Sequence, residues 1–286
     1  MITSRTRLLA VVGDPVHHSL SPLMHNAALA QAQIDACYVA LPVAADQLGN
    51  VLAALWHTQW LGLSVTLPHK QRVMAYLTEV TPVAQAIGAV NTLYRGASGW
   101  CGANTDGVGF VQPLADWSGE TAVVLGYGGA ARAVVWGLQQ RGCTAIHIFS
   151  RRPDQAVAPP ARLHPWSDLD TYLPQADLVV NTTPLGMAPE VTRSPLTPEQ
   201  LQQLPRGAWV YDLIYTPRPT QLLRWAAALG YRTQDGLAML VGQGAAAWKY
   251  WFQQEAPLAV MTQTLEQYLQ QMSASAAAGP TRDTQG

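Results

Sequence analysis

Residues 121–131 read TAVVLGYGGAA, an apolar run followed at once by a glycine-rich turn. The run Thr121–Leu125 predicts a buried strand, and the amphipathic stretch that continues to Gln140 predicts a helix. In such a strand–turn–helix the first glycine permits a tight turn, and the second lets the backbone approach a pyrophosphate at the start of the helix. The stretch therefore predicts a dinucleotide-binding site, with Gly126, Gly128, Gly129 and Ala130 as its candidate residues. The alternative is a tight turn without a ligand.

The end of the next predicted strand, Ala145–Phe149, indicates which dinucleotide is bound. Sites for NAD place an acidic residue there to hold the ribose hydroxyls, whereas Ser150, Arg151 and Arg152 follow this strand. Two guanidinium groups can bind a 2′-phosphate through paired hydrogen bonds. We therefore expect NADP(H) rather than NAD(H). The alternative is a solvated pair of arginines on a loop.

Short apolar runs alternate with amphipathic stretches along most of the chain, a pattern typical of βαβ units and largely parallel sheets. The pattern starts anew after Asp106, which predicts two α/β domains. Further strands are expected at 8–13, 37–41, 61–67, 177–181 and 209–213, a hairpin at 89–94 and 100–103, helices at 21–31, 46–57, 237–252 and 258–271, and a proline-rich loop at 156–165.

This organisation predicts specific domain bounds. We expect an N-terminal substrate-binding domain made of residues 1–106 and 240–272, and a Rossmann-type dinucleotide-binding domain made of residues 107–239. The C-terminal helices are expected to pack back on the first domain. Residues 273–286 are mostly small or polar and have little to bury, so we expect a disordered tail there.

The composition excludes several classes of protein. A length of 286 residues suggests about two domains, and 49% apolar with 12% charged residues argues against a disordered chain. The 17 basic and 18 acidic residues leave a net charge of −1, without the Lys/Arg cluster that nucleic-acid binding needs. No apolar run approaches the roughly 18 residues of a membrane span, and the N-terminus lacks the layout of a secretory signal.

Cysteine and histidine usage indicates the compartment and argues against a metal. The three cysteines are isolated in sequence, which excludes a disulfide framework and a zinc-site spacing. Three histidines lie near the polar motifs: His18, His25 and His69. They lack the spacing of metal ligands, so we expect no metal. The expectation is a reduced, cytoplasmic enzyme with a small-molecule substrate and neither a nucleic-acid nor a membrane partner.

In the first half of the chain, polar residues follow the predicted strands, where ligand sites of α/β proteins lie. Ser19 and Ser21 come after the first strand, Ser64 and Thr66 close the third, and Asn91 lies on the next. Converging hydroxyl and amide groups suit a small ligand rich in hydroxyls. Each residue also has a structural interpretation: Ser21 as a helix cap, Thr66 as a strand former and Asn91 as a turn amide.

Lys70 stands out because the chain has only two lysines, the other being Lys249. Unlike arginine, a lysine can lose its proton where a site lowers its pKa, so Lys70 is a candidate for proton transfer. Asp106 is a natural partner to orient it, although only the fold can join residues 36 positions apart. The alternative is a surface lysine without a function, which is how we interpret Lys249.

A series of short motifs occurs in order along residues 8–270. They are Gly13-x-Pro15-x-x-His18-Ser19-x-Ser21-Pro22-x-x-His25-Asn26, Val65-Thr66-x-Pro68-x-Lys70, Gly88-Ala89-Val90-Asn91-Thr92, Gly102-Ala103-Asn104-Thr105-Asp106-Gly107, Asn181-Thr182-Thr183-Pro184-Leu185-Gly186-Met187, Tyr211-Asp212-x-x-Tyr215 and Asp235-Gly236-x-x-Met239-Leu240-x-x-Gln243. With these motifs the chain resembles the shikimate dehydrogenase family of aromatic amino-acid biosynthesis. Several matches in order are much more specific than any one of them.

The resemblance implies NADPH-dependent reduction of 3-dehydroshikimate to shikimate, with Lys70 as the general acid–base paired with Asp106. Hydride would pass from the nicotinamide to the C3 ketone while Lys70 donates a proton to the developing alkoxide. Positioned proton transfer of this kind contributes about 10²–10⁴-fold in rate.

The resemblance also implies the binding residues. Substrate hydroxyls or carboxylate would be held by Ser19, Ser21, Thr66, Asn91, Asp106 and Gln243, with Tyr215 nearby. The cofactor would be held by Gly126, Gly128, Gly129, Ala130, Ser150, Arg151 and Arg152, with Thr182, Leu213, Gly236 and Met239 at the same site. One residue departs from the family: Ser64, a candidate substrate-binding residue, stands where the family commonly has Asn. Serine is shorter and lacks the amide donor, so that contact is lost, bridged by water or taken over by another group.

Three alternatives stay open. The nearest is a dehydrogenase for quinate or for an aminated analogue such as aminoshikimate, against which the Ser19-x-Ser21 pair argues. The second is a non-catalytic NADP-binding module, against which the presence of Lys70 and Asp106 argues. The third is a folate-linked dehydrogenase of similar two-domain build, which the hydroxyl-rich motifs disfavour. Both a monomer and a homodimer are compatible with the sequence.

Overall fold

The structure is a computed structural model that describes residues 2–58, 60–151, 153–155 and 157–278. Its strands are β1 (Arg7–Gly13), β2 (Ala36–Pro42), β3 (Trp60–Val65), β4 (Glu79–Val80), β5 (Thr92–Arg95), β6 (Trp100–Ala103), β7 (Thr121–Leu125), β8 (Ala145–Phe149), β9 (Ala161–His164), β10 (Leu178–Asn181), β11 (Trp209–Asp212) and β12 (Arg232–Gln234). Its α-helices are α1 (Ser21–Gln31), α2 (Leu48–Trp56), α3 (Pro82–Ile87), α4 (Asp106–Val111), α5 (Gly129–Gln140), α6 (Leu169–Tyr172), α7 (Pro198–Leu201), α8 (Gln221–Ala228), α9 (Leu237–Phe252) and α10 (Leu258–Ala278). Short 3₁₀ helices are η1 (Arg72–Tyr76), η2 (Gln112–Leu114), η3 (Trp166–Asp168) and η4 (Leu173–Gln175).

The first unit is built on a mixed sheet with the strand order β2-β1-β3-β5-β6-β4. Strand β1 pairs in parallel with β2 and β3, and the predicted hairpin β5–β6 adds the antiparallel part. Leu9 and Val11 of β1 pack into a core with α1, α9 and α10, whereas Ala10 and Val12 pack into a second core with α2. Because both faces of β1 are buried, its sequence is a continuous apolar run.

The second unit is built on an entirely parallel sheet with the strand order β12-β11-β10-β7-β8-β9. Helix α5 covers one face and the helices α6 to α8 cover the other. The strand order reverses between β7 and β10, and a doubly wound sheet of this kind binds its ligand at the carboxyl ends of the strands beside that reversal. The predicted fold class, two α/β units of which the second is Rossmann-type, is confirmed.

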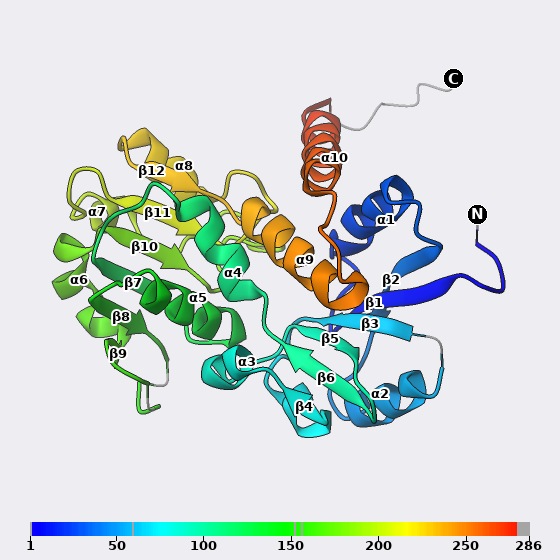
Figure 1. The fold of residues 1–286 in the computed structure, drawn as a ribbon. Helices are drawn as coiled ribbons and strands as arrows, with labels where there is room; N and C mark the ends of the chain where they lie inside the picture. The colour runs from blue at the N-terminus through cyan, green and yellow to red at the C-terminus, as the bar shows by residue number, and fades with distance from the viewer. Residues whose placement is uncertain (1, 59, 152, 156, 279–286) are drawn as a thin grey trace, which may run out of the picture.

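Helices α4 and α9 lie between the two units, and α10 lies beside α1 (Figure 1). Trp248 of α9 and Met261 of α10 share a core with Leu9 and Met24 of the first unit. The C-terminal helices therefore pack back on the first unit, as predicted. The strands divide between the two sheets on either side of α4, and the exact domain bounds, 1–106 with 240–272 and 107–239, stay a prediction.

Three local expectations are wrong. Leu20, and not Ser21, is the N-cap of α1, so the Ser21 hydroxyl is not used as a cap. Residues 161–164 of the expected loop form the edge strand β9, because the neighbouring prolines lie outside the strand and remove none of its ladder hydrogen bonds. Helix α10 continues to Ala278, past the expected helix end at residue 271, because alanine has the highest intrinsic helix propensity. The expected disorder of the tail at residues 273–286 stays a prediction. Residues 279–286 of that tail lie outside the described residues.

Within the described ranges, no helix combines the length and the apolar character that crossing a membrane requires.

Candidate active site

Lys70 and Asp106 form a nearly buried ion pair. Lys70 lies in the turn between β3 and η1, and Asp106 is the first residue of α4. The Lys70 Nζ donates a hydrogen bond to Oδ2 of Asp106 at 2.6 Å, and the two side chains are only 14% and 5% exposed. A short, charge-assisted hydrogen bond fixes the position of the ammonium group. The fold therefore brings together the two residues that stand 36 positions apart in the chain.

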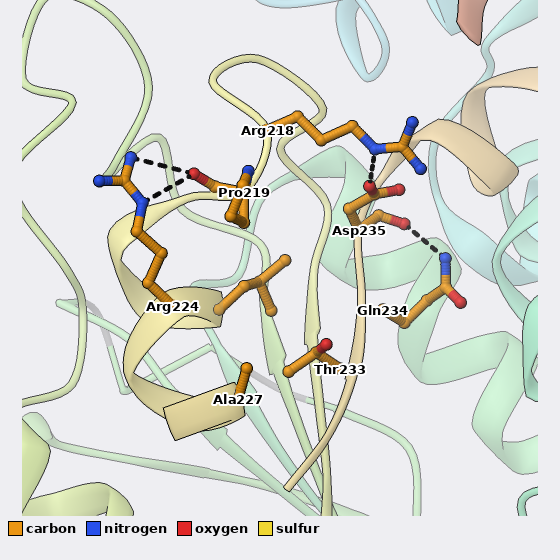
Figure 2. A pocket seen from close by; sticks show the side chains of 8 residues that line it. Arg218, Pro219, Arg224, Ala227, Thr233, Gln234 and Asp235 are labelled. Carbon is orange, nitrogen blue, oxygen red and sulfur yellow. Dashed lines mark hydrogen bonds and ion pairs between the residues drawn. The ribbon is translucent and has the colours of Figure 1, made fainter. Parts of the chain in front are cut away.

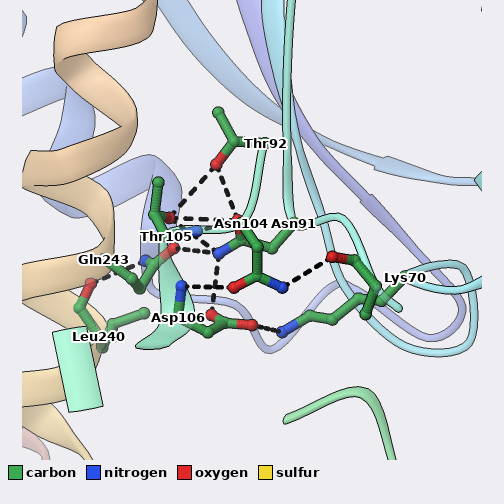
Figure 3. A network of polar contacts seen from close by, with 9 residues as sticks. Lys70, Asn91, Thr92, Asn104, Thr105, Asp106, Leu240 and Gln243 are labelled. Carbon is green, nitrogen blue, oxygen red and sulfur yellow. Dashed lines mark hydrogen bonds and ion pairs between the residues drawn. The ribbon is translucent and has the colours of Figure 1, made fainter. Parts of the chain in front are cut away.

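Asn91 is the hub of the polar network around this pair (Figure 3). Its Nδ2 donates to Oδ1 of Asp106 at 2.8 Å and to Oγ1 of Thr105 at 2.9 Å, and lies 3.4 Å from Oε1 of Gln243. Because an amide nitrogen carries two hydrogens, the contact with Gln243 is the weakest of the three. Gln243 is held mainly by its own Nε2, which donates to the carbonyl of Leu240 at 2.7 Å.

Backbone contacts hold the network in place. The amide nitrogen of Val90 donates to the Lys70 carbonyl at 2.8 Å, which ties the lysine turn to the segment before Asn91. Helices α4 and α9 cross so closely at Gly109 that an added Cβ would lie 2.6 Å from the backbone nitrogen of Gln243. The glycine is needed for this approach, and the approach brings Gln243 to the first turn of α4.

Three members of the network had no predicted role. The Asp106 nitrogen donates to Oδ1 of Asn104 at 3.0 Å, and Oδ1 of Asn91 accepts from Thr92 Oγ1 at 2.9 Å and from the Thr105 nitrogen at 2.8 Å. These residues belong to the motifs around Asn91 and Asp106, which is the only signal the sequence offers. Thr92 and Asn104 bond to residues one and two positions away, whereas Thr105 reaches Asn91 from 14 positions away, a contact that only the fold creates.

The predicted hydroxyl-bearing residues lie in the first unit. Ser21 and Ser64 are buried, and Ser19 and Thr66 are half-buried. The Ser21 nitrogen donates to Ser19 Oγ at 3.3 Å, which joins the two serines at the start of α1. Burial raises the pKa of Tyr215, and a hydrogen bond from the backbone of Leu20 partly opposes that rise, so Tyr215 lies beside the same helix start.

The predicted cofactor residues lie along the carboxyl edge of the second sheet. The parallel register aligns Phe149, Leu125, Asn181 and Asp212, the last residues of β8, β7, β10 and β11. The predicted residues that directly follow these strand ends are Ser150, Gly126, Thr182 and Leu213. The sheet thus brings together candidates that are spread over nearly 90 positions of the chain.

The glycine turn after β7 has the geometry of a ligand cradle. Gly126 has a φ of +96°, which favours glycine, and an added Cβ there would lie 2.8 Å from Oγ1 of Thr182. At Gly128 an added Cβ would meet nothing within 4 Å, so the backbone at the start of α5 is open to a ligand. A helix N-terminus left open in this way suits a phosphate, which fits a dinucleotide.

The same turn contacts the catalytic candidate. An added Cβ at Gly129, the first residue of α5, would lie 3.2 Å from Cβ and 3.4 Å from Cδ of Lys70. The start of the cofactor helix therefore lies against the methylene stem of the lysine. This contact joins the two predicted half-sites.

The remaining cofactor candidates differ in how the structure places them. Ala130 is in the first turn of α5, and Arg151 is exposed after β8. Gly236 lies against the carbonyl of Leu213, and Met239 is buried on the next turn of α9. Arg152 lies outside the described residues.

A separate surface pocket lies between α8 and β12 (Figure 2). Its charged groups are already engaged, because Arg218 forms an ion pair with Asp235 and Arg224 donates to the carbonyl of Pro219. It contains none of the predicted catalytic or substrate-binding residues.

Comparison with known proteins agrees with the geometry. Residues 11–93 match the model of the shikimate dehydrogenase substrate-binding domain, and residues 236–266 match that of the shikimate 5′-dehydrogenase C-terminal domain. A curated relative from Synechocystis sp., named shikimate dehydrogenase (NADP(+)), is 50% identical over 94% of this chain and 98% of its own.

Solved structures give the same result. The shikimate 5-dehydrogenase of Thermus thermophilus, in complex with NADP(H) and shikimate, is 35% identical with a TM-score of 0.82, over 91% of this chain and 99% of its own. The ligand-free 5-ketofructose reductase of Gluconobacter sp. is 30% identical with a TM-score of 0.79, over 93% and 100%. The structural neighbours thus include both a shikimate dehydrogenase and a 5-ketofructose reductase. The 50% identity with the Synechocystis shikimate dehydrogenase, over nearly the full length of both proteins, favours the shikimate dehydrogenases. The chain belongs to the shikimate dehydrogenase family.

Proposed function

We propose that this protein catalyses the NADPH-dependent reduction of 3-dehydroshikimate to shikimate, with Lys70 as the general acid–base and Asp106 as its partner. The observation that carries the proposal is the 2.6 Å contact between Lys70 Nζ and Oδ2 of Asp106, beside the first residue of the cofactor helix. NADPH, when bound, supplies the hydride that reduces the C3 ketone.

Lys70 donates a proton to the substrate oxygen as negative charge develops on it, and takes the proton back in the reverse direction. Asp106 orients the ammonium group, and the Asn91 amide, 2.8 Å from Oδ1, holds the second carboxylate oxygen in place. Because the Lys70 side chain is only 14% exposed, its ammonium group is largely shielded from bulk water.

The substrate is held mainly by side chains of the first unit, together with Tyr215 from the segment that follows β11 of the second. We assign its hydroxyls and carboxylate to Ser19, Ser21, Ser64, Thr66, Asn91, Tyr215 and Gln243. The burial of Ser21 and Ser64 supports this assignment, because a hydrogen bond shielded from water discriminates more strongly against a ligand that lacks the matching group.

The cofactor is held at the carboxyl edge of the second sheet. Gly126, Gly128, Gly129 and Ala130 would face the pyrophosphate, and Ser150, Arg151 and Arg152 the 2′-phosphate of the adenosine. Thr182, Leu213, Gly236 and Met239 would line the rest of the site. The open backbone at Gly128 and the exposure of Arg151 support this assignment.

A panel of substrates tests the proposal. Shikimate, quinate and aminoshikimate are offered with NADP⁺ and with NAD⁺, and 5-ketofructose with NADPH, while the absorbance of the reduced nicotinamide is followed. Shikimate with NADP⁺ should give the highest kcat/KM. A higher kcat/KM for another compound would replace the substrate, and equal efficiency with NAD⁺ would contradict the choice of cofactor. Oxidation or reduction of none of them would favour the non-catalytic NADP-binding module.

We also propose a cytoplasmic location and either a monomer or a homodimer as the functional unit. The three cysteines, Cys37, Cys101 and Cys143, are all free thiols, which suits a reducing compartment.

A further inference from the structure

Tyr38 carries a buried hydroxyl for which packing gives no reason. The residue lies on β2, is 1% exposed, and its ring stacks on His25 with the ring centroids 4.5 Å apart. No described residue offers its hydroxyl a hydrogen bond of ordinary length. The hydroxyl is thus a polar group in the interior without a settled partner.

An unpartnered buried hydroxyl costs stability, because folding removes it from water without replacing its hydrogen bonds. Phenylalanine at position 38 would give the same ring, the same stacking on His25 and the same contact with Trp251 without this cost. Packing therefore explains the ring of Tyr38 and leaves its oxygen unexplained.

The sheet directs this oxygen toward the predicted substrate site. Strand β1 lies between β2 and β3, and its residues Leu9 and Val11 pair with Tyr38 and Ser64, respectively. Side chains at laterally paired positions point to the same face of a sheet, so Tyr38 and Ser64 both face the core under α1. Ser64 lies on the far side of β1 and two positions nearer the carboxyl end of the sheet. Side chains on a strand lean along the strand direction, so the long side chain of Tyr38 can extend over β1 toward Ser64.

Two serines lie beside the hydroxyl. Burial raises the pKa of Tyr38, and the side chains of Ser64 and Ser21 lower it in part, as hydrogen-bonding groups close to a phenolic oxygen do. Both serines are themselves buried, at 7% and 6% exposure. Three hydroxyl groups from β2, β3 and α1 therefore meet at one point.

We propose that Tyr38 is a positioning residue for substrate binding, whose hydroxyl holds those of Ser21 and Ser64 from the buried side of the site. This inference rests on the proposed function, which assigns the two serines to the substrate. The Tyr38 hydroxyl itself does not touch the substrate.

The chemistry of hydroxyl groups explains the effect. A serine hydroxyl has one hydrogen to donate and two lone pairs to accept with. The Tyr38 hydroxyl also has a single hydrogen, so it donates to one serine at a time and can accept from the other. The hydrogen of the serine that accepts from Tyr38 is free to point to an oxygen of the substrate. Without that donor, the serine hydroxyls are free to hydrogen-bond to each other or to the backbone, and the substrate must first reorient them.

The test is Tyr38→Phe, which removes only the oxygen. Loss of one neutral hydrogen bond predicts a roughly three- to tenfold higher KM for shikimate. The KM for NADP⁺ should stay near the wild-type value, and the melting temperature should not fall, because phenylalanine keeps the ring packing. The kcat should change less than KM, because the interaction binds substrate and transition state alike.

Tyr211→Phe is the matched control. Tyr211 is also fully buried, its hydroxyl has no hydrogen-bond partner among the described residues, and its ring stacks on Phe110, but it lies on β11 in the second sheet. This substitution should leave the KM for shikimate unchanged. An equal rise of that KM in both variants would mean a general packing effect and would overturn the proposal, as would an unchanged KM in Tyr38→Phe.

The variants Ser21→Ala and Ser64→Ala separate this inference from the proposed function. If both leave the KM for shikimate unchanged, the assignment of the serines to the substrate fails. If both raise it but Tyr38→Phe does not, only the role of Tyr38 fails. In a protein with both serines replaced, adding Tyr38→Phe should have no further effect on KM; a further rise would overturn a role that acts through the serines.

Discussion

The two predicted half-sites differ in how far their polar groups are buried. Around Asp106, side chains of the protein itself form the hydrogen bonds of the carboxylate, whereas Arg151, at the carboxyl edge of the second sheet, is exposed to solvent. Lys70 and Asn91 occupy the two oxygens of the Asp106 carboxylate at 2.6 and 2.8 Å. Arg151, by contrast, follows β8 at the surface, and the backbone at Gly128 is open. One region is closed on itself, and the other is open to a ligand.

The difference follows from burial. A buried charge without a partner is strongly destabilising, so the pairing of Lys70 with Asp106 stabilises the folded chain. An exposed arginine stays hydrated at little cost until a phosphate replaces the water. Substitutions in the first region should therefore change the chemistry, and those in the second should change cofactor binding alone.

Lys70→Ala should have the largest effect. Removing the proton donor should lower kcat by about 10²–10⁴-fold, measured in steady-state assays with shikimate and NADP⁺. The matched control is Lys249→Ala, because the only other lysine is 56% exposed and pairs with Glu255 at the surface. A Lys70→Ala protein with wild-type kcat and a changed KM alone would contradict the acid–base role.

Arg151→Ala should act only on the cofactor. Losing a charge-assisted hydrogen bond to the 2′-phosphate, worth about 1.5–3 kcal/mol, should raise the KM for NADPH by roughly tenfold or more. The KM for NADH should stay the same, since NADH lacks that phosphate, and kcat should change little. Arg206→Ala, which alters another exposed arginine of the second unit, is the control. An unchanged KM for NADPH would mean that Arg151 is only a solvated loop residue.

His25→Phe should change how the free energy of unfolding depends on pH, and so should show the effect of burial in the first unit. Burial lowers the pKa of His25 to about 3, so below pH 6.5 the unfolded chain binds a proton that the folded chain does not. The free energy of unfolding therefore falls with decreasing pH, by up to about 1.4 kcal/mol per pH unit from this group. His25→Phe should remove that part of the slope in urea unfolding between pH 7.5 and 5.5.

Asp212, a buried carboxyl group of the second unit, responds to acid in the opposite direction, which is why the variant must be compared with the wild type at each pH. Burial raises the pKa of Asp212 to about 6, so below pH 6 this carboxyl group binds its proton more readily in the folded state and adds stability. That contribution is common to both proteins and cancels in the difference. Equal slopes for the wild type and His25→Phe would contradict the burial of a neutral imidazole.

The sequence predicted regular elements better than their ends. Strand β7 and helix α9 have the predicted bounds, because a continuous apolar run and a sustained helical periodicity are properties of the local chain. The N-cap of α1, the edge strand β9 and the end of α10 were predicted wrongly. The end of a helix or strand depends on the backbone geometry at its junction with the next segment and on small differences in helix or strand propensity. A local sequence pattern does not resolve either of these.

The site was predictable to a similar degree. Lys70, Asp106 and Asn91 were recognisable as chemically able residues in distinctive motifs, but Thr92, Asn104 and Thr105 gained roles only through their partners. Tyr38 offered no signal at all, because a tyrosine within an apolar strand is typical of a core residue. Its oxygen became informative once its surroundings were known.

The amino-acid order alone determined that there are two α/β units, that the second has a turn suited to a phosphate, and that one lysine is chemically exceptional. These features depend on residues that are close together in the chain, because hydrophobic periodicity sets the type of element and glycine permits the tight turn. Only the tertiary structure decided that α4 crosses α9 at Gly109, that the start of α5 lies against Lys70, and that hydroxyls from three elements meet at Tyr38. Such contacts join residues far apart in the chain, and their geometry is set by the packing of whole elements, which no local pattern encodes.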